Sequence, residues 1–151
     1  MQKIKVKKLE NFDNSLALPS YETKDAAGAD LRASLDNKDS LVIGPGQRVL
    51  VPTGLAFEIE PGYEVQVRPR SGLSLKTNLL VVNSPGTIDA DYRGEVKIIL
   101  GNMGTENEVI KHGDRVAQMV LAPITQAQFE MVDELSNTER GSGGFGSTGK
   151  N

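Results

Sequence analysis

The 151-residue sequence contains no cysteine, no tryptophan and only one histidine. The absence of cysteine excludes disulfide bonds, thiolate nucleophiles and cysteine-based zinc sites together, and it permits a reducing compartment. A single histidine, His112, excludes multi-histidine metal sites. Because His112 stands beside Gly113 and Asp114 in an expected turn, we interpret it as a solvated loop residue. Hydrolytic chemistry must therefore use carboxylates, hydroxyls, arginines and an oxygen-binding ion such as Mg²⁺.

Long hydrophobic runs and an excess of positive charge are also missing. No apolar block is longer than four residues, as at Leu79 to Val82, so we expect a soluble protein with no membrane partner. We expect it in the cytoplasm or, if a virus encodes it, in the interior of the host cell. The basic N-terminus, residues 1–8, lacks a following apolar stretch long enough for export and is typical of an alternating strand. A net charge of −3 argues against nucleic acid as a partner, because such binding requires a broad basic surface. An anionic ligand would need a focused pocket.

Turn signals rich in glycine, proline and aspartate recur at short intervals between runs with strand periodicity. In residues 63–68 apolar side chains alternate with polar ones, as in a half-buried strand. Long helical periodicity is missing, and only residues 73–80 favour a short helix. Three aliphatic-rich runs are expected to be strands covered on both faces: 48–51, 95–100 and 115–121. The pattern predicts an all-β sandwich, jelly roll or barrel with one short helix.

No domain boundary is visible before the C-terminal segment, so we expect a single β domain over residues 1–135 and a flexible lid over 136–151. The lid is glycine-rich and too poor in apolar groups to order by itself. It carries Arg140, Phe145 and the hydroxyls of Ser147 and Thr148, which suit a ligand with both phosphate and a base. The alternative is a plain linker.

Residues 86–94 are predicted to form a hairpin tip that carries carboxylates and a tyrosine. Asp89 follows Ile88 and precedes Tyr92 by three positions, so apolar surface could hold its carboxylate partly desolvated. A general base must be positioned in this way. The alternative is a solvated turn, because aspartate and glycine are favoured in turns.

Two further segments suit an anion. In residues 69–73, Arg70 and backbone N–H groups near a possible helix start would bind one; the alternative is Ser71 as an N-cap beside a surface arginine. Gln118 lies among apolar strand residues and needs a partner, which is either a backbone group or a phosphate. Asp30 and Arg115 are candidates for a plain salt bridge.

Five segments stand in order along the chain: AGADL at 27–31, PRSGL at 69–73, GTIDADYRGE at 86–95, DRVAQM at 114–119 and RGSGGFGSTG at 140–149. In all five the chain resembles the homotrimeric dUTPase family. The resemblance implies a jelly-roll homotrimer with active sites between subunits. It also implies hydrolysis of dUTP to dUMP and pyrophosphate with Mg²⁺, which limits uracil incorporation into DNA and supplies dUMP for dTMP synthesis.

The resemblance also implies roles for individual residues. Asp89 activates the water that attacks the α-phosphorus, Asp30 lies near the waters of the Mg²⁺ ion, and Tyr92 packs on the deoxyribose and excludes a 2′-hydroxyl. The phosphates are bound by Arg70, Ser71, Gly72 and Gln118, and uracil is read by Asn83, Thr87, Ile88 and Lys97. The lid residues Arg140, Phe145, Ser147 and Thr148 close over the site of a neighbouring subunit, Arg140 on phosphate and Phe145 on uracil.

Two alternatives share the expected fold. The dCTP deaminases carry an Ile-Asp motif on the hairpin, but their catalytic glutamate would fall at about Ile99, whose aliphatic side chain cannot transfer protons. A non-catalytic nucleotide-binding or protein-binding trimer is the second alternative. Asp89 and the complete lid motif count against it.

Overall fold

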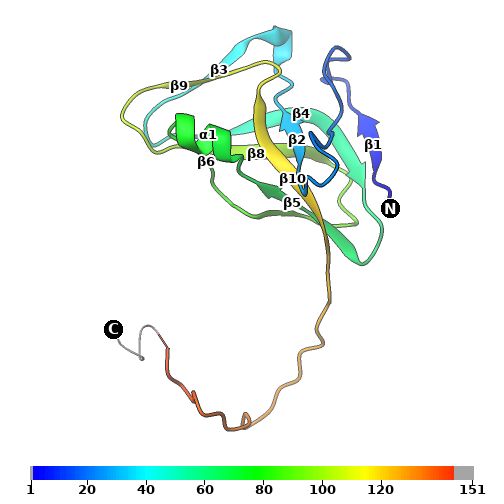
Figure 1. The fold of residues 1–151 in the computed structure, drawn as a ribbon, viewed down its shortest axis with the longest axis vertical. Coiled ribbons are helices and arrows are strands. Elements are labelled where there is room, and N and C mark those ends of the chain that lie inside the picture. The colour runs from blue at the N-terminus through cyan, green and yellow to red at the C-terminus, as the bar shows by residue number, and fades with distance from the viewer. Residues whose placement is uncertain (1, 145–151) are drawn as a thin grey trace.

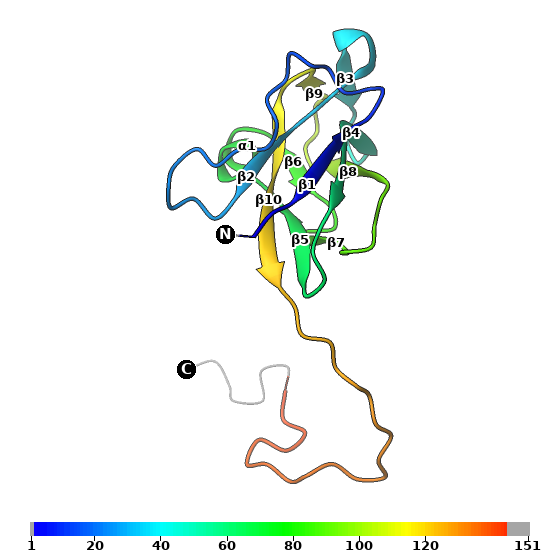
Figure 2. The same ribbon diagram turned by 90° about the vertical axis from the view of Figure 1, so that its right-hand side faces the viewer.

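The computed structural model describes residues 2–144, which contain ten strands and two short helices. Two four-stranded sheets pack face to face, one in the order β1-β4-β8-β6 and the other in the order β2-β10-β5-β7 (Figures 1 and 2). Strands β3 and β9 form a separate two-stranded sheet, and all paired strands are antiparallel. The elements are β1 (Lys5–Lys8), β2 (Ala29–Arg32), η1 (Asp36–Lys38), β3 (Ser40–Ile43), β4 (Arg48–Glu58), β5 (Tyr63–Arg68), α1 (Ser71–Lys76), β6 (Leu79–Val81), β7 (Gly86–Ile88), β8 (Glu95–Asn102), β9 (Glu108–Lys111) and β10 (Arg115–Pro123). This architecture confirms the predicted all-β jelly-roll class.

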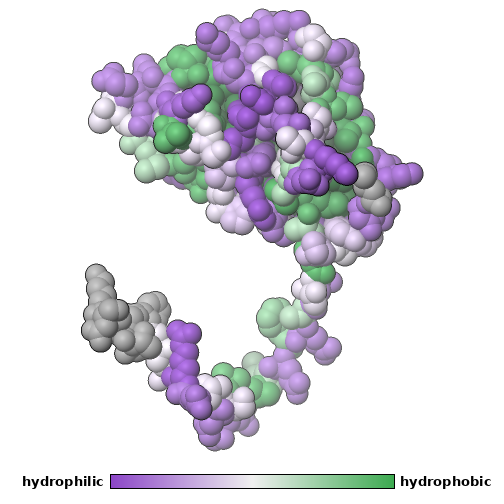
Figure 3. Space-filling model, in the orientation of Figure 1, coloured by the Kyte–Doolittle hydropathy of each residue, from purple (hydrophilic) through white to green (hydrophobic). Residues whose placement is uncertain are grey.

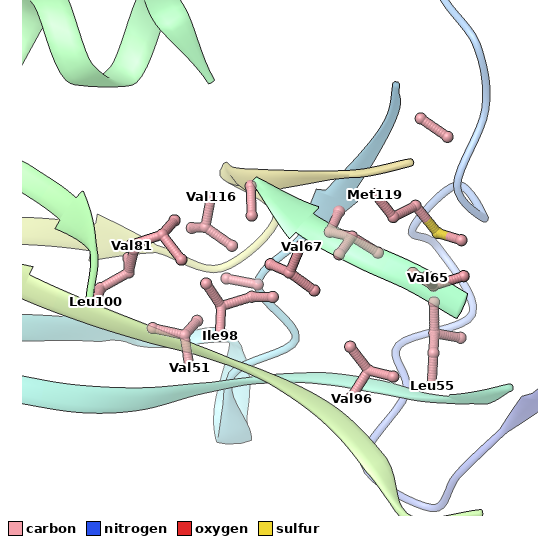
Figure 4. Close-up of a cluster of buried hydrophobic side chains, with 14 of the residues drawn as sticks. Val51, Leu55, Val65, Val67, Val81, Val96, Ile98, Leu100, Val116 and Met119 are labelled. Atoms are coloured by element: carbon pink, nitrogen blue, oxygen red, sulfur yellow. The ribbon is translucent and has the colours of Figure 1, made fainter. Parts of the chain in front are cut away.

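The core lies between the two large sheets, where aliphatic side chains from both interleave (Figure 4). One sheet supplies Val51, Leu55, Val96, Ile98 and Leu100, and the other supplies Val65, Val67, Val116 and Met119; all are buried. Each such side chain contributes about 1.5–3 kcal/mol by leaving water. The core holds the two sheets in fixed register, so residues on their outer faces and ends have defined positions.

Strand β5 matches the expected strand at residues 63–68, but three other expectations are corrected. The aliphatic strands bury only one face in this chain; Leu50, for example, is 60% exposed. The helix covers Ser71–Lys76 and ends four residues early, because Leu79 and Leu80 pair with β8 instead. Ser71 is the first helical residue rather than the N-cap, which is Arg70 without a side-chain capping bond.

The single histidine is not a solvated loop residue, because its side chain is only 11% exposed. His112 Nδ1 accepts a hydrogen bond from the backbone N–H of Leu35 at 3.1 Å, and Nε2 lies 3.1 Å from Oδ2 of Asp13. The hydrogen bond from Lys38, with others from Ser15, holds the pKa of the Asp13 carboxyl well below its ordinary range. His112 therefore helps to fasten the segment before β2 to the β2–β3 connection.

The last strand ends at Pro123, and the chain then leaves the sandwich as an extended segment without strands or helices up to residue 144 (Figures 1 and 2). This segment carries exposed apolar side chains at Phe129, Met131, Val132 and Leu135. Figure 3 shows green, hydrophobic surface along the segment. Among residues 2–144, no helix combines the length and apolar character needed to cross a bilayer. A boundary near residue 135 remains a prediction.

Strand β4 contains an irregularity centred on Gly54, where its pairing with β8 shifts register between Pro52 and Ala56. Gly54 adopts a φ of +67°, and a β-carbon there would lie 2.7 Å from the backbone of Phe12. Both the conformation and the space therefore require glycine. Thr53 Oγ1 spans the irregularity by donating to the carbonyl of Val96 at 2.6 Å.

We expect Gly54→Ala to destabilise the fold by about 2–5 kcal/mol, because it adds a backbone collision to the cost of a positive φ. Gly46→Ala is a matched control, since Gly46 has a φ of +69° but nothing within 4 Å of its absent side chain. The control should lose only about 1–2 kcal/mol. Urea unfolding measures both, and equal losses would contradict the proposed collision with Phe12.

Candidate active site

One polar cluster joins strands β2 and β10 to the short connection between β5 and α1. Asp30 Oδ1 accepts a hydrogen bond from Arg70 Nε at 2.6 Å, and its Oδ2 accepts one from Arg115 Nη1 at 3.0 Å. The Asp30 side chain is only 12% exposed, so these are well-shielded, charge-assisted contacts. We call Asp30, Arg70, Arg115 and Gln118 the arginine cluster. The proposed Asp30–Arg115 salt bridge is present, and Arg70 joins it.

Strand pairing explains why this cluster forms. Gln118 of β10 lies opposite Asp30 of β2 on one side and opposite Arg68 of β5 on the other. Its amide donates to the carbonyl of Pro69 at 2.8 Å, so the amide has the backbone partner that one interpretation required. A β-carbon on Gly28 would collide with the Gln118 carboxamide, so glycine there leaves room for it. Ser71 and Gly72 lie exposed beside the cluster in the first turn of α1.

A second group of residues lines a pocket of about 330 Å³ on the outer face of β4 and β8. A pocket of this size lies at the small end of the range for organic ligands. Tyr92 stands at this pocket, and its hydroxyl donates to the backbone carbonyl of Glu95 at 2.9 Å. Lys97 Nζ lies 3.3 Å from Glu95 Oε2. We call this cavity the β8 pocket; its lining is Leu50, Ile88, Tyr92, Glu95, Lys97 and Ile99.

The connection that carries these residues differs from the simple hairpin tip predicted. Strand β6 does pair with β8, but β7 (Gly86–Ile88) crosses to the other sheet and pairs with β5. The chain then returns to β8 past Tyr92. A β-carbon on Gly94 would lie 2.6 Å from Cζ of Tyr92, so glycine allows the tyrosine ring to fold back over the chain.

Asp89 directly follows β7, beside Ile88 of the β8 pocket. It faces an open hollow of about 800 Å³ whose charged lining includes Lys5, Glu58 and Arg93. The expectation that apolar surface partly desolvates Asp89 is wrong for this single chain, because the residue is exposed. The adjacent strand end positions Asp89 without burying it.

Asp89 and the arginine cluster lie at opposite ends of β5. Ile88, next to Asp89, pairs with Val65, whereas Arg70 follows the other end of the strand five residues later. At about 3.3 Å per residue this separates the two regions by roughly 15 Å. The described part of one chain therefore presents two separate groups of candidate residues instead of one cluster, and we call each group a half-site.

Three of the remaining predicted residues, Asn83, Thr87 and Arg140, are not brought into either half-site. Asn83 and Thr87 are exposed, and Thr87 pairs with Gln66 on β5. Arg140 Nε donates to the carbonyl of Gly143 at 2.8 Å within the extended segment. The predictions for Phe145, Ser147 and Thr148 lie outside the described residues. Leu50 and Glu95 also line the pocket, although the sequence did not predict a role for either. Glu95 could have been noticed as a carboxylate at the beginning of an aliphatic strand.

Within residues 2–144 no three histidine, cysteine or acidic side chains are arranged to hold a metal ion. Both carboxylate oxygens of Asp30 are engaged by arginines. Asp30 could therefore contact a metal ion only through an intervening water molecule, and most of the ion's ligands would have to come from the substrate and from solvent. Substrate phosphates and waters are the usual remaining ligands of Mg²⁺.

The fold and its two half-sites are those of a jelly-roll β-sandwich with separate apolar and cationic sites. The family model for dUTPase matches residues 14–149. The chain therefore belongs to the dUTPase family, whose members are dUTP diphosphatases.

Individual relatives agree with this assignment. The deoxyuridine 5′-triphosphate nucleotidohydrolase of Bdellovibrio bacteriovorus is 59% identical over 152 residues, covering 99% of each chain. That of Roseobacter denitrificans is 56% identical and covers 97% of this chain and 95% of its own. Among solved structures, a dUTPase variant of Staphylococcus bacteriophage 80alpha with dUpNHpp has a TM-score of 0.87 at 27% identity, covering 99% of this chain and 100% of that one.

A second solved relative concerns metal. A variant dUTPase of phage phi11 of S. aureus, described as revealing the coordination of a structural Mg(II) ion, has a TM-score of 0.76 at 25% identity. The match covers 87% of this chain and 97% of that one.

We expect Gly94→Ala to push the Tyr92 ring out of the β8 pocket and to weaken binding of dUpNHpp by about tenfold or more. Tyr92→Phe is the matched control, because it removes only the hydroxyl contact with Glu95 and should cost about 2–10-fold. Isothermal titration calorimetry gives both dissociation constants. Unchanged affinity in Gly94→Ala would contradict a binding role for the tyrosine ring.

Proposed function

We propose that the protein hydrolyses dUTP to dUMP and pyrophosphate at sites built from two half-sites of different subunits. The observation that carries the proposal is the placement of Asp89 and the arginine cluster at opposite ends of β5. Membership in the dUTPase family supports the reaction and substrate. The separation supports assembly, because the general base and the cationic donors must act on adjacent phosphates, whereas Asp89 and the arginine cluster of one chain stand roughly 15 Å apart.

The β8 pocket suits the nucleoside. Ile88, Leu50 and Ile99 offer apolar surface to a base, and Tyr92 offers a flat ring against which deoxyribose packs without space for a 2′-hydroxyl. Backbone groups of the β6–β8 connection, with Asn83 and Thr87, are proposed to read uracil. Uracil presents a carbonyl and an N–H where cytosine presents an amine and a bare nitrogen, so a fixed site leaves unpaired groups with cytosine.

The arginine cluster suits the phosphates. Arg70 and Arg115 bring two positive charges to one half-buried carboxylate, and Ser71 and Gly72 expose a hydroxyl and backbone N–H groups beside them. Gln118 would exchange its contact with Pro69 for one to a phosphate oxygen. Fixed cationic donors stabilise the charge that develops on phosphate oxygens during bond cleavage.

The chemical step is assigned to Asp89, which lies beside the nucleoside pocket. Its carboxylate accepts a proton from a water molecule as the water oxygen forms a bond to the α-phosphorus. The bond from the α-phosphorus to the bridging oxygen breaks, and pyrophosphate leaves toward the arginine cluster. The neighbouring subunit is proposed to provide the desolvation that one chain lacks around Asp89.

Magnesium is proposed to bind together with the triphosphate, mainly through phosphate oxygens and waters. Asp30 would orient one of those waters from within the arginine cluster. Bound in this way, the ion would neutralise phosphate charge. The lid residues Arg140, Phe145, Ser147 and Thr148 are proposed to close over a neighbour's site. Among the described residues, the Arg140 side chain donates to Gly143 within its own segment and to neither half-site.

Wild-type protein is expected to release pyrophosphate from dUTP in Mg²⁺ and hardly from dCTP, dTTP or UTP. Asp89→Asn should bind dUpNHpp normally but lose about 10²–10⁴-fold in kcat, the usual contribution of a general base. A malachite green assay with added pyrophosphatase follows turnover. Normal turnover by the variant would assign the base elsewhere, and binding without turnover in the wild type would favour a non-catalytic nucleotide-binding or protein-binding trimer.

Shared sites predict that two inactive variants restore activity when mixed. Asp89→Asn subunits retain the arginine cluster, and Arg70→Ala subunits retain Asp89. In co-refolded trimers assembled at random from equal amounts, about one quarter of the sites would combine both intact halves. Separately refolded samples mixed afterwards are the control. Sites confined to single chains would give no recovery, and light scattering showing a stable monomer would exclude the assembly itself.

A further inference from the structure

Glu95 occupies the junction between the β4 irregularity and the β8 pocket. Its side chain is 14% exposed, and Oε1 accepts hydrogen bonds from the Gly54 N–H and from Asn11 Nδ2, both at 2.8 Å. The register shift between Pro52 and Ala56 places Gly54 outside regular pairing with β8, so the carboxylate satisfies its N–H. These two contacts fix the carboxylate in the sandwich.

The same residue also holds the two polar groups of the β8 pocket. Oε2 lies 3.3 Å from Lys97 Nζ, and the backbone carbonyl accepts the Tyr92 hydroxyl. The Lys97 side chain is 45% exposed and has a flexible four-carbon stem, so it would sample many conformations without a partner. Tyr92 and Lys97 therefore both depend on the placement of one residue.

We propose that Glu95 is a positioning residue for nucleoside binding that acts through Lys97. This proposal rests on the proposed function, since it assigns the nucleoside to the β8 pocket. The carboxylate holds the ammonium at the pocket wall, where it can donate to a base or sugar oxygen. It also balances the charge of Lys97, so the pocket as a whole stays neutral.

Neutrality matters because the ligand has one charged end and one uncharged end. An unbalanced ammonium in the β8 pocket would attract phosphate oxygens and compete with the arginine cluster for them. Some nucleotides would then bind in the reversed orientation, with the phosphates in the β8 pocket. The Glu95–Lys97 pair removes this competition while keeping the ammonium as a hydrogen-bond donor.

Glu95→Gln tests the proposal without leaving the Gly54 N–H unpaired, because the amide oxygen can still accept the two hydrogen bonds that Oε1 accepts. We expect KM for dUTP and Kd for dUpNHpp to rise about 2–5-fold, with kcat changed less than KM. The thermal midpoint should match that of the wild type. In a Lys97→Met background the same substitution should have no further effect on KM or Kd.

Glu108→Gln is a matched control, because Glu108 Oε1 likewise accepts bonds from a backbone N–H and an asparagine amide, at 2.8 and 2.9 Å, away from both half-sites. It should leave KM and Kd unchanged. An equal effect of Glu95→Gln in both backgrounds, or none in either, would overturn the positioning role. Wild-type protein that neither binds dUpNHpp nor hydrolyses dUTP would instead overturn the proposed function.

Discussion

Strand β5 imposes the constraint on which the site depends. It pairs with β7 near its beginning, which places Asp89 there, and it runs into Arg70 at its end. Because the core packs against β5 from the inside through Val65 and Val67, the strand cannot bend to bring its ends together. The spacing between the two half-sites is thus a property of the fold, and it is the reason for proposing that another chain supplies the missing half.

Close packing around glycines sets the details within each half-site. At Gly28 the missing β-carbon makes room for Gln118, and at Gly94 it makes room for the Tyr92 ring. Side chains larger than hydrogen would displace groups proposed to contact substrate, while leaving most of the core untouched. Such positions connect local backbone geometry to ligand binding, and their substitution separates binding defects from folding defects.

Sequence patterns could predict the fold class and the strand at residues 63–68, because alternation over one half-buried strand is a local property. They could not predict that β7 leaves its apparent hairpin and joins β5, because that choice depends on non-local pairing. The surroundings of His112 were missed for the same reason: its partners Leu35 and Asp13 lie 77 and 99 residues away. The family resemblance assigned Ile88 and Lys97 to uracil and Tyr92 to the deoxyribose, but the contacts of Glu95 with Gly54 and Asn11 join residues far apart in the sequence and have no local signal.

The two half-sites differ in charge, and under the proposed function this difference orients the bound nucleotide. In the β8 pocket Glu95 offsets Lys97, whereas in the arginine cluster one carboxylate faces two guanidinium groups. Exposed Glu22, 3.6 Å from Arg115, adds little attraction because water screens it. A nucleotide entering with its triphosphate toward the β8 pocket would lose the guanidinium contacts and gain no net charge in return. Under the proposed function, the orientation with the triphosphate at the arginine cluster is therefore favoured before any base-specific hydrogen bond forms.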